Sequence, residues 1–467
     1  MQKLFKNCYD MDTKCYEKYN LTEDILMEHA SLEIEKYIRK KFKKRKTVLI
    51  IAGAGNNGAD GITLARLLHK DFKVKLYMPF GIKSEMAKLQ LQRAKFVGIK
   101  VVKKVKKSDI IADSLFGAGL NRALNSDAVK IINRLNSLDA FKIACDIPSG
   151  IDELGNPNPV AFKADITITM GALKESLFND NAKDLVGKVK VANLGVAREL
   201  YEDESSSFLL DKSDFNPPVR IAKNSHKGTF GHSAIFSGEK EGASIISAMS
   251  ASRFGAGLVT LVYHEKINHP PYLMSNTTVP KNTTAIAIGM GLGDFFEKEF
   301  LEKYVIGSNL PIVLDADALY KKELLEIVKQ KREVVITPHP KEFSAILKLL
   351  DDVEISVEEI QKDRFNLAKT FSKNYPNCTL VLKGANPIIA KAGEIFVNRF
   401  GTQVLAKGGS GDILSGLVVA LLSQGYNGLN ASITSSLALS FASKKYKYVN
   451  YSALPIDIIN NLAKLGR

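Results

Sequence analysis

The chain has 467 residues, of which 45% are hydrophobic and 25% charged, and its formal net charge is +15. This composition excludes collagen-like, low-complexity and wholly disordered proteins, and the length predicts about two to four domains. The longest apolar run, Ile413–Leu422, is too short for a membrane helix, which needs roughly 18–20 residues. We therefore expect no membrane partner.

The positive charge is concentrated in the runs Arg39–Lys46, Lys103–Lys107 and Lys444–Lys447. Solvated faces explain such runs, and attraction to an anionic partner is the alternative; we expect no nucleic-acid partner. The four cysteines have no CxxC spacing, and the first twenty residues lack the apolar segment of a signal peptide. This pattern predicts reduced thiols and a cytoplasmic protein.

In chain order, the first half alternates helices with short apolar strands. Residues 22–42 are predicted to form a helix with Thr22 as its N-cap, and the β-branched run Thr47–Ala52 is typical of a buried parallel strand. A glycine-rich loop and a helix follow, and strands and helices then alternate to about residue 170. The alternation predicts a Rossmann-like, doubly wound α/β domain.

The pattern is interrupted over residues 200–227, which are polar and contain Pro217–Pro218. A second α/β alternation runs from there to the end, with final helices predicted over 411–422 and 431–442. We therefore predict two domains, residues 1–210 and 211–467, each of the α/β class.

A glycine-rich loop follows the first predicted strand. Gly53–Gly58 satisfies GxGxxG between a strand and a helix, a context in which backbone N–H groups can approach a pyrophosphate. A dinucleotide-binding dehydrogenase also needs an acidic residue at the end of the next strand to hold a ribose. That strand ends YMPFG without one, so the dehydrogenase is the weaker interpretation.

Oxygen-bearing side chains accompany this loop and two further strand ends. The loop continues as NNGADG, and the two later strands end in DSLFGAGL and DIPSG. Ligands of open α/β sheets bind beyond the carboxyl ends of strands, where all three segments are expected. Oxygen ligands with few carboxylates suit a monovalent cation better than a transition metal. Alternatively, Asp113 and Asp146 only cap helices or turns.

GAGNNGADG, DSLFGAGL and DIPSGID resemble the motifs of the YjeF N-terminal family, the NAD(P)H-hydrate epimerases, over about residues 1–200. The resemblance implies that a potassium ion is bound by Asn57, Asp113 and Ser149, and that Asp146 is catalytic. It implies substrate contacts for Asn56, Asn57, Gly58, Ala59, Asp60, Gly117, Ala118, Gly119, Leu120, Asn121, Arg122 and Ala123. The chain departs from the family pattern at Ala54 and Ala59, and the Cβ of Ala59 requires a negative φ there.

The segment KGGSGDILSG, residues 407–416, is the most informative in the second half. Gly408, Gly409 and Gly411 leave backbone N–H groups accessible before a helix expected to start near Asp412. Such a helix N-terminus stabilises a transferring phosphoryl group. Asp412 is then placed to accept a hydroxyl proton as the base of a phosphotransferase; a simple N-cap is the alternative.

GGxGD before a helix resembles the ribokinase-like superfamily. With KGTFG, GMGLG, DAD, TPHPKE and KGA, over about residues 210–467, it resembles the ADP/ATP-dependent NAD(P)H-hydrate dehydratases. The resemblance implies that Asp412 is catalytic and that Gly293 and His339 contact substrate, a buried structural histidine being the alternative for His339. It implies nucleotide contacts for Lys383, Gly384, Ala385, Asn386, Pro387, Gly408, Gly409, Ser410 and Gly411.

Together the two resemblances imply a bifunctional enzyme of nicotinamide nucleotide repair, both isomerase and lyase. It would interconvert the R and S forms of NAD(P)H hydrated at C6 and dehydrate the S form at the expense of ADP or ATP. The implied cofactors are K⁺ in the first domain and Mg²⁺ with ADP or ATP in the second, and we expect a homo-oligomer. A kinase of a small alcohol and an RNA-binding scaffold are the alternatives; the intact polar residues of the N-terminal motifs argue against the scaffold.

Overall fold

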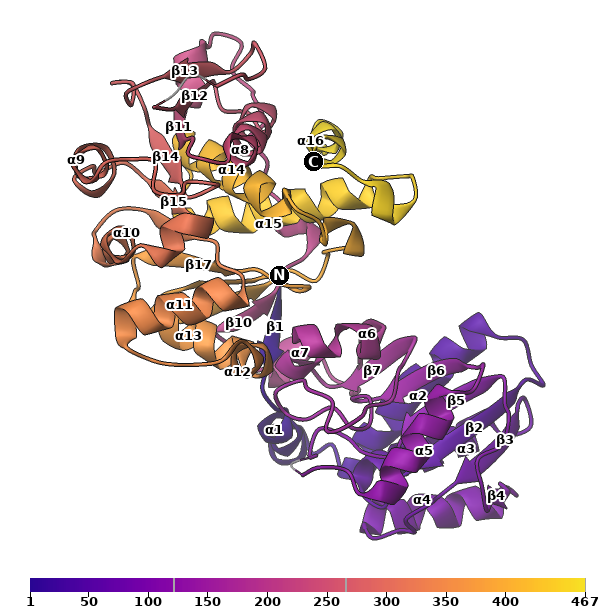
Figure 1. Ribbon diagram of the computed structural model, residues 1–467. Helices are drawn as coiled ribbons and strands as arrows, with labels where there is room; N and C mark the ends of the chain where they lie inside the picture. Colours follow the sequence, from indigo (N-terminus) through magenta and orange to yellow (C-terminus); the bar gives the residue numbers. More distant parts are fainter. Residues whose placement is uncertain (121, 265–266, 467) are drawn as a thin grey trace. The chain divides into compact units, whose positions relative to one another are not determined.

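The computed structural model describes residues 1–120, 122–264 and 267–466. The chain divides into two compact units, residues 3–205 and residues 206–467, and Met1 and Gln2 belong to the second. The division lies within a few residues of the predicted domain boundary at residue 210. Both units are built from alternating strands and helices (Figure 1).

The N-terminal unit contains a parallel sheet. The strand β2 has the sequence TVLIIA and is buried from its second residue onward, because helices cover both faces of a parallel sheet. The strand order is β4-β3-β2-β5-β6-β7-β9, and all neighbours are parallel. The bounds are β2 Thr47–Ala52, β3 Lys73–Tyr77, β4 Val101–Val102, β5 Ile110–Ser114, β6 Phe141–Cys145, β7 Ile166–Met170 and β9 Lys188–Ala192. A separate short parallel pair joins β1 (Gln2–Phe5) to β8 (Leu173–Lys174).

Helices cover both faces of this sheet. One face packs against α2 (Glu23–Lys41), α3 (Asn56–Leu68) and α4 (Glu85–Phe96), and the other against α5 (Ser126–Asn136). The predicted helix over 22–42 is thus confirmed, with Thr22 in the N-cap position. The unit also contains α1 (Tyr9–Tyr19), α6 (Lys183–Val186) and α7 (Arg198–Tyr201).

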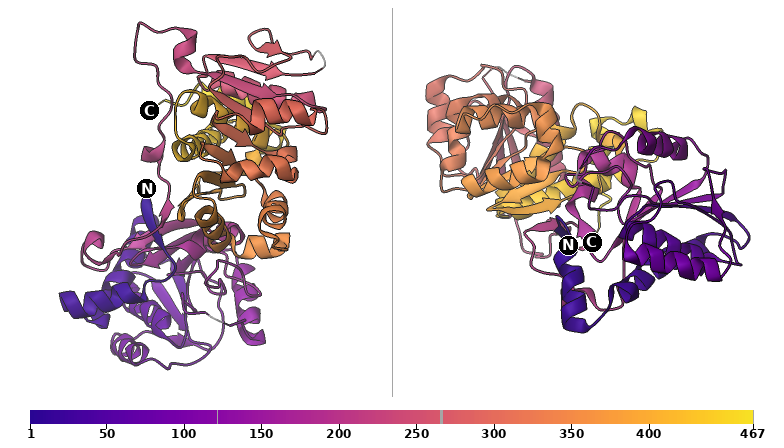
Figure 2. Two further views of the ribbon diagram at one scale, coloured as in Figure 1. Left: turned by 90° about the vertical axis from the view of Figure 1, so that its left-hand side faces the viewer. Right: turned by 90° about the horizontal axis from the view of Figure 1, so that it is seen from below.

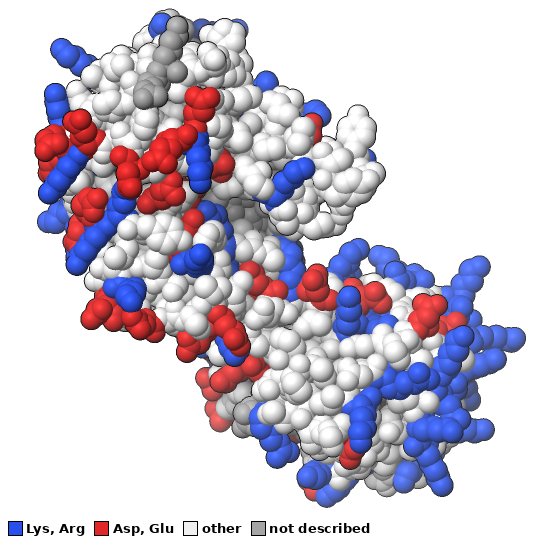
Figure 3. Space-filling view, viewed as in Figure 1, with Lys and Arg blue, Asp and Glu red and all other residues white. Residues whose placement is uncertain are grey.

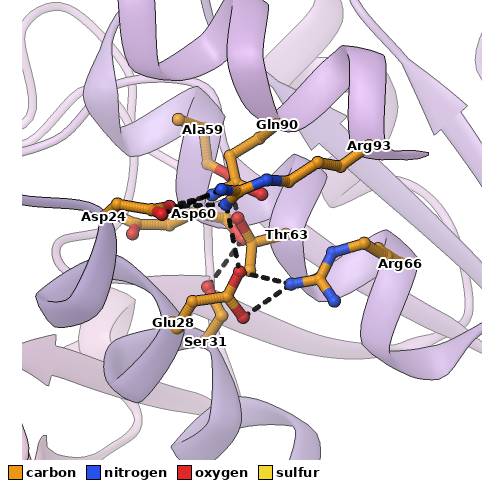
Figure 4. Close-up of polar contacts among 9 residues, drawn as sticks. All are labelled: Asp24, Glu28, Ser31, Ala59, Asp60, Thr63, Arg66, Gln90 and Arg93. Atoms are coloured by element: carbon orange, nitrogen blue, oxygen red, sulfur yellow. Dashed lines mark hydrogen bonds and ion pairs between the residues drawn. The ribbon is translucent and has the colours of Figure 1, made fainter. Parts of the chain in front are cut away.

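Polar contacts hold α2 against α3 and α4 (Figure 4). Asp24 of α2 accepts hydrogen bonds from Gln90 Nε2 at 2.8 Å and from Arg93 Nη1 at 2.6 Å. Glu28 pairs with Arg66 of α3, and the Ser31 hydroxyl donates to the backbone carbonyl of Asp60 at 3.0 Å. These contacts fix the first turns of α3, where the glycine-rich motif continues.

The C-terminal unit has a larger, mostly parallel sheet. Its strand order is β13-β12-β11-β14-β15-β16-β17-β18-β19-β10, in which β18 is antiparallel to both neighbours. The bounds are β10 Ser207–Leu209, β11 His232–Phe236, β12 Leu258–Val262, β13 Met274–Asn276, β14 Ala285–Ile288, β15 Ile312–Leu314, β16 Val334–Ile336, β17 Cys378–Leu382, β18 Ile388–Lys391 and β19 Glu394–Val397.

The central helix of this unit is α14 (Ser410–Ser423), which is apolar around most of its circumference and buried from Ile413 onward. It packs on the sheet between α8 (Glu241–Arg253) and α15 (Gly428–Lys444), and it also contacts α16 (Pro455–Leu462). Gly416 permits the close approach to α8, because a methyl group there would overlap the Ser247 carbonyl oxygen. On the opposite face of the sheet lie α10 (Lys322–Leu325), α11 (Pro340–Asp351) and α13 (Arg364–Asn374), while α9 (Lys298–Leu301) and α12 (Val357–Lys362) lie at its periphery (Figures 1 and 2).

Charge is unevenly distributed over the surface. Lys and Arg side chains gather on the part of the N-terminal unit that Figure 3 shows, consistent with the exposed runs Arg39–Lys46 and Lys103–Lys107. Across the described ranges, no helix combines the length and the apolar composition needed to span a bilayer.

Candidate functional site

The glycine-rich loop of the N-terminal unit is packed as tightly as its sequence suggests. A methyl group on Gly53 would overlap the carbonyl oxygen of Leu115, and one on Gly58 would overlap the carbonyl oxygen of Gly53. The five predicted substrate-binding residues at positions 56–60 form the first turns of α3. They therefore lie at the carboxyl edge of the sheet, directly after β2.

Asp113 is the centre of a buried polar cluster at the same edge. It lies within β5 and is fully buried, and its Oδ1 accepts from the Leu115 N–H at 3.2 Å, so it also caps the turn after the strand, as the alternative expected. The Ser149 hydroxyl donates to Asp113 Oδ1 at 2.7 Å, and the Ser149 backbone N–H donates to Oδ2 at 2.8 Å. Burial raises the pKa of Asp113 to about 6, although these hydrogen bonds oppose the shift.

Asn57 contributes a buried polar group without a hydrogen-bond partner. Both its amide nitrogen and its amide oxygen are buried without a hydrogen bond, which is costly unless another ligand satisfies them. The side chain lies against the loop after β5, since a methyl group on Gly117 would come within 3.2 Å of the Asn57 Cβ. Ser149 Oγ also contacts this loop, by accepting from the Phe116 N–H at 2.8 Å. The orphaned amide oxygen of Asn57 and the oxygens of Asp113 and Ser149 are the kind of ligands that a monovalent cation takes, so the residue types fit the predicted potassium ion.

Asp146 follows β6 in the left-handed conformation, with φ of +67°. Its Oδ1 accepts from Lys174 Nζ at 2.6 Å and from the Met170 N–H at 3.1 Å, and its Oδ2 accepts from the Ala118 N–H at 3.4 Å. Burial alone would raise the pKa of Asp146, but the charge and hydrogen bond of Lys174 outweigh it and lower the pKa below its ordinary value. Asp146 is therefore an ionised group tied to the loop that contains Ala118.

The loop over residues 117–123 connects β5 to the region of α5. Gly117 lies beside Asn57 and Ala118 contacts Asp146, so the loop joins two of the predicted motifs. Leu120 and Ala123 belong to the same loop, as do Gly119 and Arg122. The remaining predicted contact, Asn121, lies outside the described residues.

In the C-terminal unit, the helix of the GGSGD motif begins at Ser410, two residues before the predicted start. Gly409 is its N-cap, with φ of +93°, and Asp412 lies in the first turn. The alternative that Asp412 is only an N-cap is therefore wrong. Burial, and next the negative charge of Asp315, raise the pKa of Asp412 to about 6, while Lys383 opposes the shift. Such a carboxylate can accept a proton near neutral pH.

The buried Asp315 and the partly buried Lys383 form an ion pair beside this helix terminus. Lys383 Nζ lies 2.8 Å from Asp315 Oδ1 and 3.4 Å from Glu342 Oε2, and the Ser415 hydroxyl of α14 donates to Asp315 Oδ2 at 2.7 Å. A methyl group on Gly411 would lie 3.6 Å from Lys383 Nζ. The arrangement places the Lys383 cation next to the accessible backbone of the glycine loop.

His339 caps a helix and remains accessible. Its ring Nδ1 accepts from the Glu342 N–H at 3.1 Å, and Glu342 Oε2 accepts from the His339 N–H at 2.7 Å, which closes a capping box at α11. The side chain is 46% exposed, so the alternative of a buried structural histidine is wrong. The other predicted substrate contact, Gly293, donates its N–H to Asp317 Oδ2 at 3.0 Å.

The segment Lys383–Pro387 follows β17 and is held from within by Arg364. This arginine is fully buried, and its Nη2 donates to the carbonyl oxygens of Leu382 and Lys383, each at 3.2 Å. The Pro387 carbonyl oxygen accepts from the Asn398 N–H at 3.0 Å. Arg364 thus fixes the loop at which nucleotide contacts are predicted.

Several residues at or near the candidate sites could not be assigned a role from the sequence. Lys174 is separated from Asp146 by 28 residues, and Asp12 of α1 and Arg364 stand in no recognisable motif. Asp315 was included in the DAD segment without a role. In the described ranges, no group of three or more His, Cys, Asp or Glu side chains is arranged to hold a metal ion.

Two family models match the chain in the expected order. Residues 23–176 match the model described as YjeF-related protein N-terminus, and residues 234–464 match that of NAD(P)H-hydrate dehydratase. The bifunctional NAD(P)H-hydrate repair enzyme Nnr of Helicobacter pylori is 40% identical over 100% of both chains. The chain belongs to the family of bifunctional NAD(P)H-hydrate repair enzymes.

Another member of this repair family, from Dictyoglomus turgidum, is 33% identical over 94% of this chain and 93% of its own. Among solved structures, the ADP/ATP-dependent NAD(P)H-hydrate dehydratase of Bacillus subtilis is 25% identical, with a TM-score of 0.44 over 52% of this chain and 92% of its own. The predicted family, enzyme class and two-domain α/β fold are confirmed. Membership of the repair family also favours the predicted function over the dehydrogenase, small-alcohol kinase and scaffold alternatives.

Proposed function

We propose that the unit of residues 3–205 interconverts the two C6 epimers of hydrated NAD(P)H, and that the unit of residues 206–467 dehydrates the S epimer with ADP or ATP. The family of full-length relatives supports the pairing of these two reactions. The observation that carries the proposal is the position of Asp412, a proton acceptor one turn inside a helix whose N-terminus is a glycine loop.

In the dehydratase reaction, Asp412 accepts the proton of the C6 hydroxyl as the oxygen attacks the terminal phosphorus of the nucleotide. The backbone N–H groups of Gly408–Gly411 stabilise the negative charge on the moving phosphoryl group. The bond between C6 and the phosphate oxygen then breaks, with the N1 electron pair assisting. Loss of a proton from C5 restores the double bond. Phosphorylation is useful because phosphate is a much better leaving group than hydroxide.

We place the nucleotide between the segments Lys383–Pro387 and Gly408–Gly411. Lys383 supplies a cation there, and Arg364 keeps the first segment in position. Mg²⁺ would be held mainly by the nucleotide phosphates and neutralises part of their charge when bound. We place the hydrated ring near Gly293 and His339, because they follow the parallel strands β14 and β16 and so lie at the same end of the sheet.

In the epimerase reaction, we assign the cation site to Asn57, Asp113 and Ser149 and the ring site to residues 56–60 and 117–123, beside Asp146. The unsatisfied amide of Asn57 supports the cation site. A bound K⁺ would compensate the buried charge of Asp113 and be coordinated by the oxygen of that amide. Asn57 and Ser149 would then hold α3 and the loops after β5 and β6 in fixed positions around the substrate.

The experiment that tests the proposed function starts from a defined mixture of the two C6 epimers of hydrated NADH. Purified protein is added with Mg²⁺, K⁺ and either ATP or ADP, and the dihydronicotinamide absorbance is followed. Complete conversion supports both activities and identifies the donor. Conversion that stops at the S fraction, with spontaneous epimerisation subtracted, contradicts the epimerase half; no conversion contradicts the dehydratase half.

The cellular setting is part of the proposal. We propose a cytoplasmic location, supported by four free cysteines that are all buried. The expected homo-oligomer and the expected lack of a nucleic-acid or membrane partner stay predictions.

A further inference from the structure

A buried ion pair lies at the carboxyl edge of the N-terminal sheet. The Lys174 side chain, from β8, is 3% exposed and the Asp146 side chain is 13% exposed. A buried pair of this kind is weak evidence for stability, because the desolvation of both charges offsets their attraction. Its position beside the predicted substrate loop therefore calls for a functional explanation.

The contacts of this pair hold both charges in place. Besides Asp146, Lys174 Nζ donates to the Thr169 hydroxyl at 2.9 Å and to the Met170 carbonyl oxygen at 3.2 Å. Burial alone would lower the pKa of Lys174, but the charge of Asp146 outweighs it and raises the pKa. Asp146 meanwhile accepts backbone N–H groups from the loop after β5 and from the end of β7. A carboxylate bonded in this way is a poor carrier of protons.

We propose that Lys174 is a positioning residue that holds the Asp146 carboxylate as a permanent negative charge facing the reacting ring. The inference rests on the proposed epimerase function and deepens it. It assigns to Asp146 the stabilisation of positive charge rather than the transfer of a proton.

The chemistry of epimerisation creates that positive charge. The C6–O bond breaks with its electron pair on oxygen, which takes up a proton and leaves as water. The N1 electron pair forms an N1=C6 double bond, so the ring becomes cationic. Water then adds to the opposite face of C6 and releases a proton, so that no net proton is consumed. A fixed carboxylate beside the ring stabilises the cation in the transition state.

Lys174 is needed because the other ionisable groups around Asp146 are acidic. Cys8 lies directly before α1 and Asp12 lies within it, and both interact with the pair. Asp60 of α3 and Cys145, the last residue of β6, interact with Asp146. Glu23 of α2 interacts with Asp12 and Asp60. Burial, and next the neighbouring charges, raise the pKa of Asp12 to about 6. Without Lys174, burial and the neighbouring acids would raise the pKa of Asp146 above its ordinary value.

The two roles of Asp146 give opposite results when the Lys174 charge is removed. Lys174→Gln keeps a hydrogen-bond donor and removes the charge, so the pKa of Asp146 rises. If Asp146 acts as a fixed anion, epimerisation slows at least tenfold at pH 6 and recovers in part at pH 8.5. If Asp146 is a proton donor, the same variant is faster than the wild type at pH 6, and our inference is wrong.

The measurement uses the full chain with K⁺ and no nucleotide, and follows the exchange of the two epimers of hydrated NADH between pH 5.5 and 9. Lys174→Arg, which restores the charge, should return the wild-type pH profile. Lys163→Gln, at an exposed lysine of the same unit, should leave it unchanged. A uniform loss at every pH indicates a merely structural role and overturns the proposal. If Lys174→Gln does not fold, Thr169→Val, which removes one hydrogen bond to Asp146, should give a smaller shift of the same sign. A wild type that does not epimerise contradicts the proposed function instead.

Discussion

The Asp412 carboxylate is the proposed proton acceptor in the C-terminal unit. Asp412→Asn keeps the size of the side chain and removes the proton acceptor, so we expect dehydration of the S epimer to fall by about 10²–10⁴-fold. Epimerisation, measured without nucleotide, should be unchanged. The opposite result, with dehydration retained within a factor of three, would show that Asp412 is not the base.

The environment of Asp412 also predicts the pH dependence of dehydration. Burial and the charge of Asp315 raise the pKa of Asp412 to about 6. Lowering the pH through this value protonates the base, so kcat/KM for the S epimer should fall about tenfold per pH unit below pH 6. The profile is measured against the rate without enzyme. Because Asp315→Asn removes a negative neighbour, it should move the acid limb to lower pH.

At the scale of elements, replacing a glycine by alanine should have opposite effects on stability in α14 and in α8. Alanine is favoured over glycine in helices by about 1 kcal/mol. At Gly416 the new methyl group would overlap backbone of α8, which costs about 1–3 kcal/mol, whereas Gly242 of α8 faces open space. The net cost of up to about 2 kcal/mol should let Gly416→Ala lower the melting temperature by up to roughly 8 °C, and Gly242→Ala should leave it equal or higher. Calorimetry of both variants decides, and equal shifts would contradict the packing argument.

The elements show what the sequence could predict. The run Thr47–Ala52 coincides with β2, and Thr22 is the N-cap of α2, because both follow from local composition. α14 starts two residues before Asp412, because Gly409 takes a left-handed N-cap conformation at a place where Pro455 leaves no room for a Cβ, and the sequence does not show that contact. Lys174 and Arg364 could not be predicted, because their partners lie on other segments. Neither residue type by itself implies an ion pair or support of a loop.

At the scale of the whole molecule, the division into two compact units predicts that the two reactions can be separated. Asp146→Asn should retain dehydration of the S epimer, and Asp412→Asn should retain epimerisation. An equal mixture of the two variants should then convert both epimers completely, because the S epimer that Asp412→Asn releases is the substrate that Asp146→Asn dehydrates. Failure of the mixture, with each single activity intact, would indicate that the substrate must pass within one chain.

The reactivity of the four buried cysteines can report which unit of the molecule unfolds. Cys8, Cys15 and Cys145 lie in the N-terminal unit, and Cys378 lies in the C-terminal unit. A thiol reagent that cannot reach them in the native state reacts only where the chain unfolds, so the stoichiometry of labelling reports the unit that unfolds. Three labels per chain under mild denaturant would mark the loss of the epimerase unit with the dehydratase unit intact, and a single label would mark the reverse.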